Sequence, residues 1–307
     1  GDHRDLHSFP TRRSSDLVVI SPSHTVFFKG SSVFPGKGYE TPLGLVETDR
    51  ELADKLANIN PSRIYYSNMG HSTGTTRGKQ ALEVQLPFLQ VMLGNFKLVA
   101  IVMGDQEDES IRSLGEALAA AIKGTNTLIV ASSDLSHFHN AKIATRLDSA
   151  VRQAVERYDE SFLIDTLESG KGEACGGGPI AATFIATRRL GGTECRFIDY
   201  SHSGQTTGEL DEVVGYLSAV IVADKKPAAR EVIGARAAGE MKKKDERISD
   251  ENRKLLLSIA REAIRAHLDL EEYTPPVREA LSVHKGAFVT LRSEERRVGK
   301  ECRSRWS

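Results

Sequence analysis

Short apolar runs alternate with stretches of helical periodicity along most of the chain. Residues 17–20, 98–103 and 127–131 are mainly apolar runs of strand length, and such runs are typical of strands buried on both faces. Residues 195–200 and 213–222 are predicted to add the closing strands. Between these segments, apolar residues recur every three or four positions and predict helices over residues 48–59, 111–122, 143–155 and 179–190.

This alternation of strands and helices predicts an α/β sandwich with a substantially parallel sheet. In such sheets, ligands bind where loops leave the carboxyl ends of the strands. The loops expected at that edge are residues 21–24, 104–106 and 132–137, and two of the three carry a histidine. Functional side chains are therefore expected in these loops.

Both ends of the chain differ from its middle. Residues 1–17 and 293–307 are polar and show neither a helical nor a strand period. They resemble translated sequencing-adapter text, and we interpret them as non-native ends that must be set aside before the fold is predicted. The protein between them is then expected to be a fragment cut at both ends, starting near Val18 and stopping near Arg292.

A change of composition predicts a domain boundary. Residues 18–223 carry the α/β pattern, whereas residues 224–247 are rich in charge, Ala and Gly and are predicted to form a linker. A new helical stripe begins near Ile248, so residues 248–292 are predicted to be the start of a second, truncated α+β domain. That segment is short for a secure core of its own.

Composition and charge exclude several classes of protein. The 307 residues include 41 Lys and Arg against 42 Asp and Glu, a net charge of −1, which argues against a nucleic-acid-binding protein. No apolar run approaches the roughly 20 residues that a membrane span needs, so no membrane association is expected. Three cysteines cannot form a disulfide scaffold and no signal peptide is recognised, so we expect a reducing, cytoplasmic location.

The histidine-bearing loops offer candidate metal ligands. His24 follows the first strand and is a candidate metal ligand or general base, although a histidine that is hydrogen-bonded to the backbone is the favoured interpretation when this residue is taken alone. Asp134 and His137 follow the third strand, and a turn would let them converge as ligands or as a carboxylate–histidine pair. The alternative is that Ser and Asp in this loop only cap a helix. His139 is expected at the surface.

Cys175 lies in the most distinctive segment, Cys-Gly-Gly-Gly-Pro. The glycines would let backbone amides approach a ligand, and a helix N-terminus lowers the pKa of a nearby thiol. Cys175 is therefore a candidate soft metal ligand, redox thiol or nucleophile, or else a small buried residue at a tight turn. Cys195 is expected in the core and residues 71–76 in an exposed loop. No G-x-S-x-G elbow and no phosphate-binding P-loop motif is found.

Several motifs, taken in order, resemble the Memo family, called AmmeMemoRadiSam system protein B in bacteria and archaea. They are SPSH at 21–24, ALEVQLPFLQ at 81–90, SSDLSH at 132–137, CGGGPI at 175–180, YSHSG at 200–204 and VVGY at 213–216. The resemblance implies a LigB-like fold, similar to class III extradiol dioxygenases. It also implies a pocket with metal-binding histidines and a cysteine, which His24, Asp134, His137 and Cys175 would line here.

Residues 248–264 and 286–291 resemble the start of an AMMECR-type domain, AmmeMemoRadiSam system protein A. The name of that system implies a radical-SAM protein as a partner. Two departures from the Memo pattern affect the site: the upstream Pro-His-Ala-Gly motif is missing, and Gln80 stands in a segment where the family often has a histidine. We therefore expect the metal site to lack at least one ligand.

These observations predict a metal-binding protein with a redox or oxygenase-like role. Cys175, His137 and Asp134 are the expected catalytic residues, and His24 joins them as a metal ligand. Iron is favoured by the family resemblance, whereas the thiolate would also suit copper or zinc. Two alternatives stay open: a non-catalytic module that binds a peptide or a metal, and thiol-based catalysis by Cys175. The small-molecule or peptide ligand is not specified by the sequence.

Overall fold

The computed structural model describes residues 16–71 and 82–223. The predicted linker, the predicted second domain and the C-terminal end lie outside the described residues. So do almost all of residues 1–17 and most of the predicted loop at 71–76. The fold and the site below are therefore those of the α/β part of the chain.

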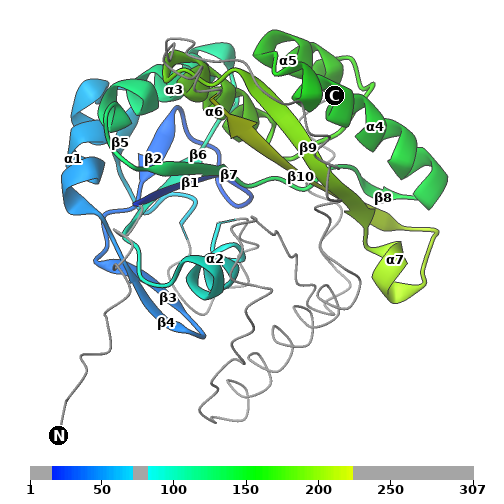
Figure 1. Cartoon of the computed structure of the whole chain (residues 1–307), viewed down its shortest axis with the longest axis horizontal. Helices are drawn as coiled ribbons and strands as arrows, with labels where there is room; N and C mark the ends of the chain where they lie inside the picture. Colours follow the sequence, from blue (N-terminus) through cyan, green and yellow to red (C-terminus); the bar gives the residue numbers. More distant parts are fainter. Residues whose placement is uncertain (1–15, 72–81, 224–307) are drawn as a thin grey trace, which may run out of the picture. The chain divides into compact units, whose positions relative to one another are not determined.

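A five-stranded sheet forms the centre of this part (Figure 1). Its order is β5-β2-β6-β1-β7, and its strands are β1 (Leu17–Pro22), β2 (Ser31–Val33), β5 (Ile64–Tyr66), β6 (Leu98–Met103) and β7 (Leu128–Ala131). β6, β1 and β7 run parallel, as do β2 and β5, whereas β2 pairs antiparallel with β6. The predicted α/β class with a mostly parallel sheet is confirmed.

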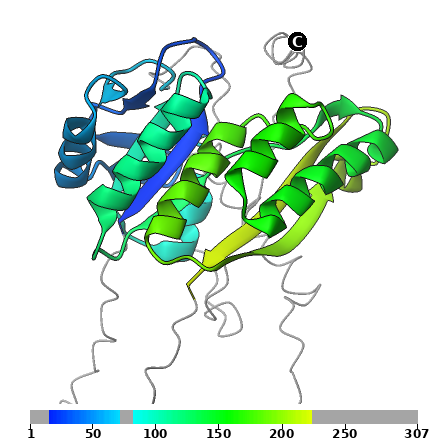
Figure 2. The same ribbon diagram turned by 90° about the horizontal axis from the view of Figure 1, so that it is seen from above.

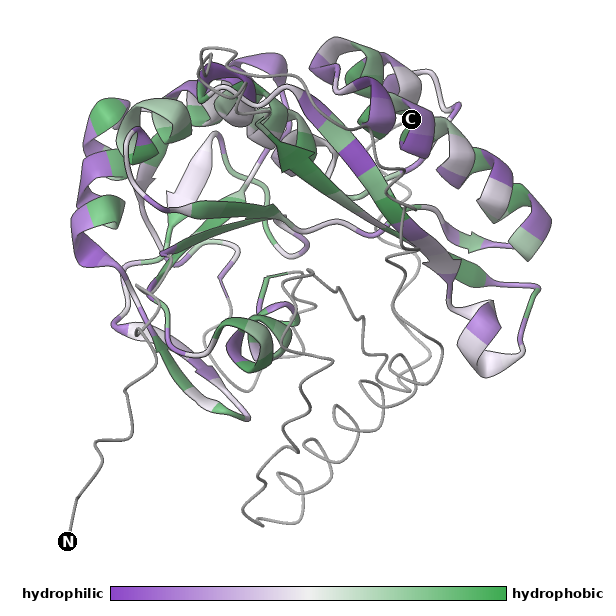
Figure 3. Cartoon of the chain, in the orientation of Figure 1, coloured by the Kyte–Doolittle hydropathy of each residue, from purple (hydrophilic) through white to green (hydrophobic). Residues whose placement is uncertain are grey.

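The central strands are apolar because both of their faces are buried. Val18 and Ile20 of β1 pack into one core, and Leu17 and Val19 pack into a second core on the opposite face. This alternation is the period-2 geometry of a strand, and Figure 3 shows the central strands in hydrophobic colours. Leu17 is fully buried and pairs with Leu98 and Leu128, so the folded region includes the residue just before the expected start at Val18.

Helices α1 (Arg50–Ile59), α3 (Asp108–Ile122) and α6 (Gly177–Arg189) contribute side chains to the core that contains Val18 and Ile20. Asp49 starts α1 by accepting the amide hydrogen of Leu52, a typical N-cap contact. α3 and α6 pack closely (Figure 2). A Cβ on Gly115 would lie 2.7 Å from the Ile185 side chain, so the glycine permits this approach.

A second sheet lies beside the first and is antiparallel, with the order β8-β10-β9. Its strands are β8 (His137–His139), β9 (Glu194–His202) and β10 (Val213–Val222). Helix α4 (Ala141–Arg157) packs against this sheet, and α5 (Glu160–Glu168) packs against α4 and α6. The two predicted closing strands therefore exist but belong to this separate sheet. The short helix α7 (Gly204–Thr207) lies between β9 and β10.

The opposite face of the central sheet is covered by smaller elements. These are the hairpin β3 (Gly38–Thr41)–β4 (Gly44–Glu47) and helix α2 (Leu86–Leu93), which the apolar pattern alone does not predict. Tyr39, Val46 and Leu86 fill the second core from this side. Within the described residues, no helix combines the length and apolar character needed to cross a membrane.

Candidate functional site

The candidate site lies at the carboxyl edge of the parallel strands. β1 and β7 end beside each other, and the Ser132 amide donates to the Ile20 carbonyl at 2.8 Å. The Ser23 amide likewise donates to the Met103 carbonyl at the end of β6, at 2.8 Å. The loops that carry His24 and Asp134 therefore leave the same edge, as parallel pairing predicts. His24 is half-buried there.

The loop after β7 is anchored from beneath by a buried carboxylate. Oδ1 of Asp148, on α4, accepts the Ser136 amide at 2.9 Å, and Oδ2 accepts the Tyr200 hydroxyl at 2.7 Å. Asp148 is fully buried, and this burial raises the pKa of its carboxyl above the ordinary range. Ser136 is thereby fixed, and with it the backbone that leads into His137.

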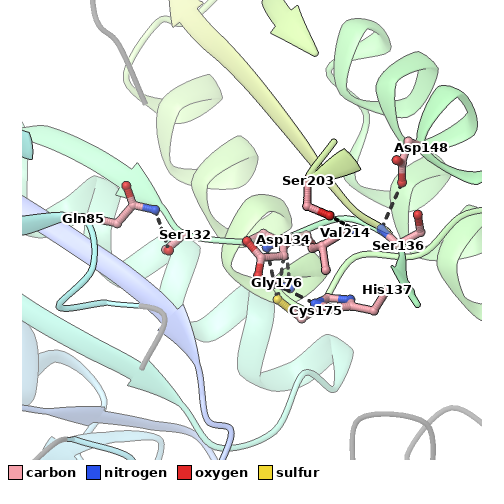
Figure 4. Close-up of polar contacts among 11 residues, drawn as sticks. Gln85, Ser132, Asp134, Ser136, His137, Asp148, Cys175, Gly176, Ser203 and Val214 are labelled. Carbon is pink, nitrogen blue, oxygen red and sulfur yellow. Dashed lines mark hydrogen bonds and ion pairs between the residues drawn. The ribbon is translucent and has the colours of Figure 1, made fainter. Parts of the chain in front are cut away.

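Cys175 lies directly against this loop (Figure 4). Its amide donates to the Asp134 carbonyl at 3.1 Å, while the Asp134 amide donates to the Cys175 Sγ at 3.2 Å. The next amide, of Gly176, donates to Ser133 Oγ at 2.8 Å. The thiol is half-buried, lies just before the N-terminus of α6 and accepts a backbone N–H. These are features that stabilise a thiolate.

The Asp134 and His137 side chains converge, as the sequence predicts. Their nearest atoms, Asp134 Oδ2 and His137 Nε2, are 3.7 Å apart, which is within ion-pair range but too long for a hydrogen bond. Phe138 follows with a φ of +59°, a left-handed conformation that costs of order 1 kcal/mol in a bulky residue. This conformation occurs between the two histidines of β8.

His139 is not the surface residue that the sequence suggests. Its Nε2 lies 2.9 Å and 3.0 Å from the two carboxylate oxygens of Glu173, and the imidazole is only 23% exposed. Glu173 precedes Cys175 by two residues. The pair therefore ties β8 to the segment that leads into the cysteine.

The three glycines after Cys175 serve packing more than ligand access. A Cβ on Gly176 would lie 2.5 Å from the Ser132 carbonyl, and one on Gly177 would lie 2.3 Å from the Leu167 side chain. The Gly176 and Gly178 amides already donate within the protein. The sequence suggested that these amides would be open to a ligand. The Gly176 and Gly178 amides are not, because each already donates a hydrogen bond within the protein.

The donor set for a metal is suitable in kind but incomplete in number. Imidazole, carboxylate and thiolate groups suit iron, copper or zinc. Within residues 16–71 and 82–223, however, no three His, Cys, Asp or Glu side chains are arranged so that they could hold a metal ion. The structure brings Asp134, His137 and Cys175 into one cluster and puts His24 in a loop at the same sheet edge. The described residues alone do not make a complete metal site.

A second buried polar cluster was missed by sequence reasoning. His71, expected in an exposed loop, is buried: its Nε2 lies 3.1 Å from the Ser32 carbonyl and its Nδ1 lies 2.5 Å from the Tyr39 hydroxyl. A carbonyl only accepts, so Nε2 carries the proton and Nδ1 accepts from Tyr39. Burial lowers the pKa of His71 to about 4.

Glu83 lies near Tyr39, and its charge helps raise the pKa of the Tyr39 hydroxyl, after the larger effect of burial. Among the described residues, its buried Oε2 has no hydrogen-bond partner. Burial raises the pKa of the Glu83 carboxyl to about 7. No spacing in the sequence indicates this cluster, although Glu83 lies within the EVQLPF segment that carries the family resemblance.

Cys195 occupies the core, as predicted. It lies on β9 and is 7% exposed. Burial, and to a smaller extent the charge of Glu156, raises the pKa of its thiol to about 11. The two described cysteines therefore have opposite environments.

The fold and the site define an α/β protein with a polar cluster around a half-buried cysteine at the carboxyl edge of its sheet. The chain belongs to the Memo family: residues 5–220 match the family described as Memo-like protein. This confirms the resemblance drawn from the motifs. The AMMECR-type domain stays a prediction.

Archaeal relatives agree with this assignment. A MEMO1 family protein of Methanothermobacter thermautotrophicus is 35% identical over 202 residues, which cover 65% of this chain and 71% of the relative. One from Methanosarcina mazei is 35% identical over 219 residues, covering 70% and 79%. A solved structure, uncharacterized protein JW3007 from Escherichia coli K12, is 17% identical with a TM-score of 0.44, covering 66% of this chain and 86% of that one.

Proposed function

We propose that this Memo-family protein is a redox protein whose central functional group is the Cys175 thiolate, used as a soft donor to a transition metal. The observation that carries the proposal is the 3.2 Å contact between the Asp134 amide and Sγ, beside the Asp134–His137 pair. A thiolate stabilised by a backbone N–H and a helix N-terminus is ready to bind a metal without first losing a proton.

The metal itself stays a proposal. Iron is favoured by the family expectation, and copper or zinc by the softness of a thiolate. His24 and Cys175 are the donors that we propose from the described residues, with His137 and Asp134 as further donors or as an acid–base pair beside them. Because these residues do not complete a site, at least one more donor must come from elsewhere in the protein.

Cys175, Asp134 and His137 also support a second candidate function, thiol chemistry without a metal. The same N–H contact that favours a metal-binding thiolate also favours a nucleophile. The Asp134–His137 pair, with one oxygen and one ring nitrogen 3.7 Å apart, could hold or deliver a proton next to it. A non-catalytic module that binds a peptide or metal would use the same cluster of side chains with no turnover.

Metal titration separates these functions. We would titrate purified protein with Fe(II), Cu(I) and Zn(II) separately and measure affinity in the wild type, Cys175→Ser, His24→Ala and the control Cys195→Ser. Loss of a direct ligand should cost more than the roughly 10–100-fold typical of a supporting residue, whereas Cys195→Ser should leave binding unchanged. If Cys175→Ser binds as tightly as the wild type, the metal proposal is wrong.

Turnover distinguishes an enzyme from a binding module. Metal-loaded protein should change its absorption spectrum when oxygen or peroxide is added if the function is redox. It should not change if the protein only presents a ligand.

We further propose the LigB-like relationship and a radical-SAM partner on the family resemblance alone. Both are analogies, since a shared fold does not fix a function. Co-purification of the native complex would test the partner.

A further inference from the structure

Gln106 joins the loop after β6 to the turn that carries Cys175. Its Nε2 donates to the Cys175 carbonyl at 2.9 Å, and its Oε1 accepts the Gly178 amide at 2.5 Å. The orientation of the amide is fixed by chemistry, because the carbonyl of Cys175 only accepts and the N–H of Gly178 only donates. One side chain therefore spans the whole turn from Cys175 to Gly178.

Helix α6 needs such a contact because it has no cap of its own. The first amides of a helix have no partner within the helix, and side chains of Ser, Thr, Asp or Asn at the N-cap usually satisfy one of them. The N-cap of α6 is Gly176, which has no side chain and makes no capping bond. Gln106 supplies the missing acceptor from a different element.

Gly178 is small for the same reason. A Cβ on this residue would lie 2.9 Å from both Cγ and Oε1 of Gln106. Any larger residue there would push the glutamine away from the turn. The absence of a side chain at Gly178 therefore makes room for the side chain of Gln106.

We propose that Gln106 is a positioning residue that holds the Cys175 Sγ against the Asp134 amide and so sets the reactivity of the thiol. The inference rests on the proposed function, which makes Cys175 the central group. Gln106 acts through the backbone: it fixes the carbonyl of Cys175, and the orientation of that peptide directs the side chain toward Asp134. It does not touch the sulfur itself.

Alkylation of Cys175 and Cys195 by iodoacetamide, read out for each of them by mass spectrometry at one neutral pH, tests this role. Gln106→Met keeps the length of the side chain and removes both hydrogen bonds, and Gln106→Glu keeps the acceptor but loses the donor to Cys175. Gly178→Ala displaces the glutamine without removing it. Gln85→Met is the matched control, because Gln85 bonds to Ser132 in the neighbouring loop at 3.0 Å and does not span the turn.

Each Gln106 variant and Gly178→Ala should slow alkylation of Cys175 about threefold to tenfold, the range that corresponds to losing about one net hydrogen bond. Gln85→Met should change it less than twofold. The double variant Gln106→Met with Gly178→Ala should be no slower than the slower single variant, since both changes remove the same contact. Labelling of Cys195 should stay unchanged throughout.

The sign of the effect separates positioning from a purely structural role. If Gln106 only stabilised the fold, its loss would open the protein and speed the labelling of both cysteines, and the inference would be overturned. Unchanged Cys175 labelling in the variants would overturn it too, while the proposed function would stand. If Cys175 in the wild type reacts no faster than Cys195, the thiolate on which the proposed function rests is absent, and the inference fails with it.

Discussion

Asp134 and Cys175 hold each other through a reciprocal pair of contacts. The Cys175 amide donates to the Asp134 carbonyl at 3.1 Å, and the Asp134 amide donates to the Cys175 Sγ at 3.2 Å. The two residues are 41 positions apart in the chain, so the contact exists only in the folded protein. The Asp134 N–H is expected to stabilise the ionised form of the Cys175 thiol more than the neutral form.

Selective labelling at pH 6.5 follows from this contact. Cys175 is half-buried and accepts an N–H, whereas the Cys195 thiol is buried and has a pKa of about 11. At pH 6.5 almost none of Cys195 is a thiolate, so its labelling should be negligible on the timescale on which Cys175 reacts completely. Peptide mapping after a timed pulse of alkylating reagent would measure both. Equal labelling would show that the Asp134 contact does not activate Cys175.

Asp148 should tolerate an amide but not an alanine. Burial raises the pKa of its carboxyl, so the side chain gains little from its charge. In Asp148→Asn, the amide oxygen can still accept the Ser136 N–H, and the amide nitrogen can donate to the Tyr200 hydroxyl oxygen. Asp148→Ala removes the acceptor of the buried Ser136 N–H and one partner of the part-buried Tyr200 hydroxyl, and it should cost about 1–3 kcal/mol of unfolding free energy. Urea denaturation of both variants measures the difference, and an equal loss would contradict this account of the network.

His71 and Glu83 should have opposite effects on stability between pH 4.5 and 6.5. The folded-state pKa of His71 is lowered to about 4, so unfolded protein binds more protons and stability rises with pH up to about 6.5. The folded-state pKa of Glu83 is raised to about 7, so folded protein binds more protons and stability falls as pH rises from about 4.5 to 7. In the wild type these two slopes largely cancel.

Glu83→Gln should expose the His71 slope. From pH 4.5 to 6.5, the unfolding free energy of the variant should rise. This rise should exceed the change in the wild type by up to about 2 kcal/mol. Denaturation curves at several pH values give this directly. His71→Gln should show the reverse, a fall in stability with rising pH. If Glu83→Gln follows the wild-type curve, Glu83 does not hold its proton in the folded state between pH 4.5 and 6.5.

The sequence predicted the strands that are buried on both faces, because such strands are continuous apolar runs. β1 and β6 are buried on both faces, and this produces the continuous apolar runs. Short strands give no such signal: β2 is Ser-Ser-Val and β8 is His-Phe-His, and each is held by its neighbours in the sheet. Their existence depends on pairing with distant segments, which a local pattern does not contain.

The candidate site was predictable as a set of loops but not as a set of contacts. Parallel strands carry their following loops to one edge, which is why Asp134 and His137 could be named in advance. The environment of His139 depends on Glu173, which is 34 positions away, and that of His71 depends on Tyr39. Such partners are fixed by tertiary packing, so the sequence alone indicated exposed residues at both positions.

Gly176→Ala tests whether the glycines after Cys175 are required for packing. The new Cβ would lie 2.5 Å from the Ser132 carbonyl and 2.7 Å from the Ser133 Cβ, and neither belongs to the end of a flexible side chain that could swing away. We therefore expect a loss of about 1–3 kcal/mol, the usual range for overpacking a fixed environment. Gly124→Ala is the comparison, because its Cβ would meet nothing within 4 Å and only the φ of +79° opposes it, at about 1 kcal/mol. Chemical denaturation ranks the two variants. If Gly176→Ala is as stable as the wild type, the loops around Cys175 can separate freely, and the close packing of Cys175 against Ser132 to Asp134 is not what fixes the thiol.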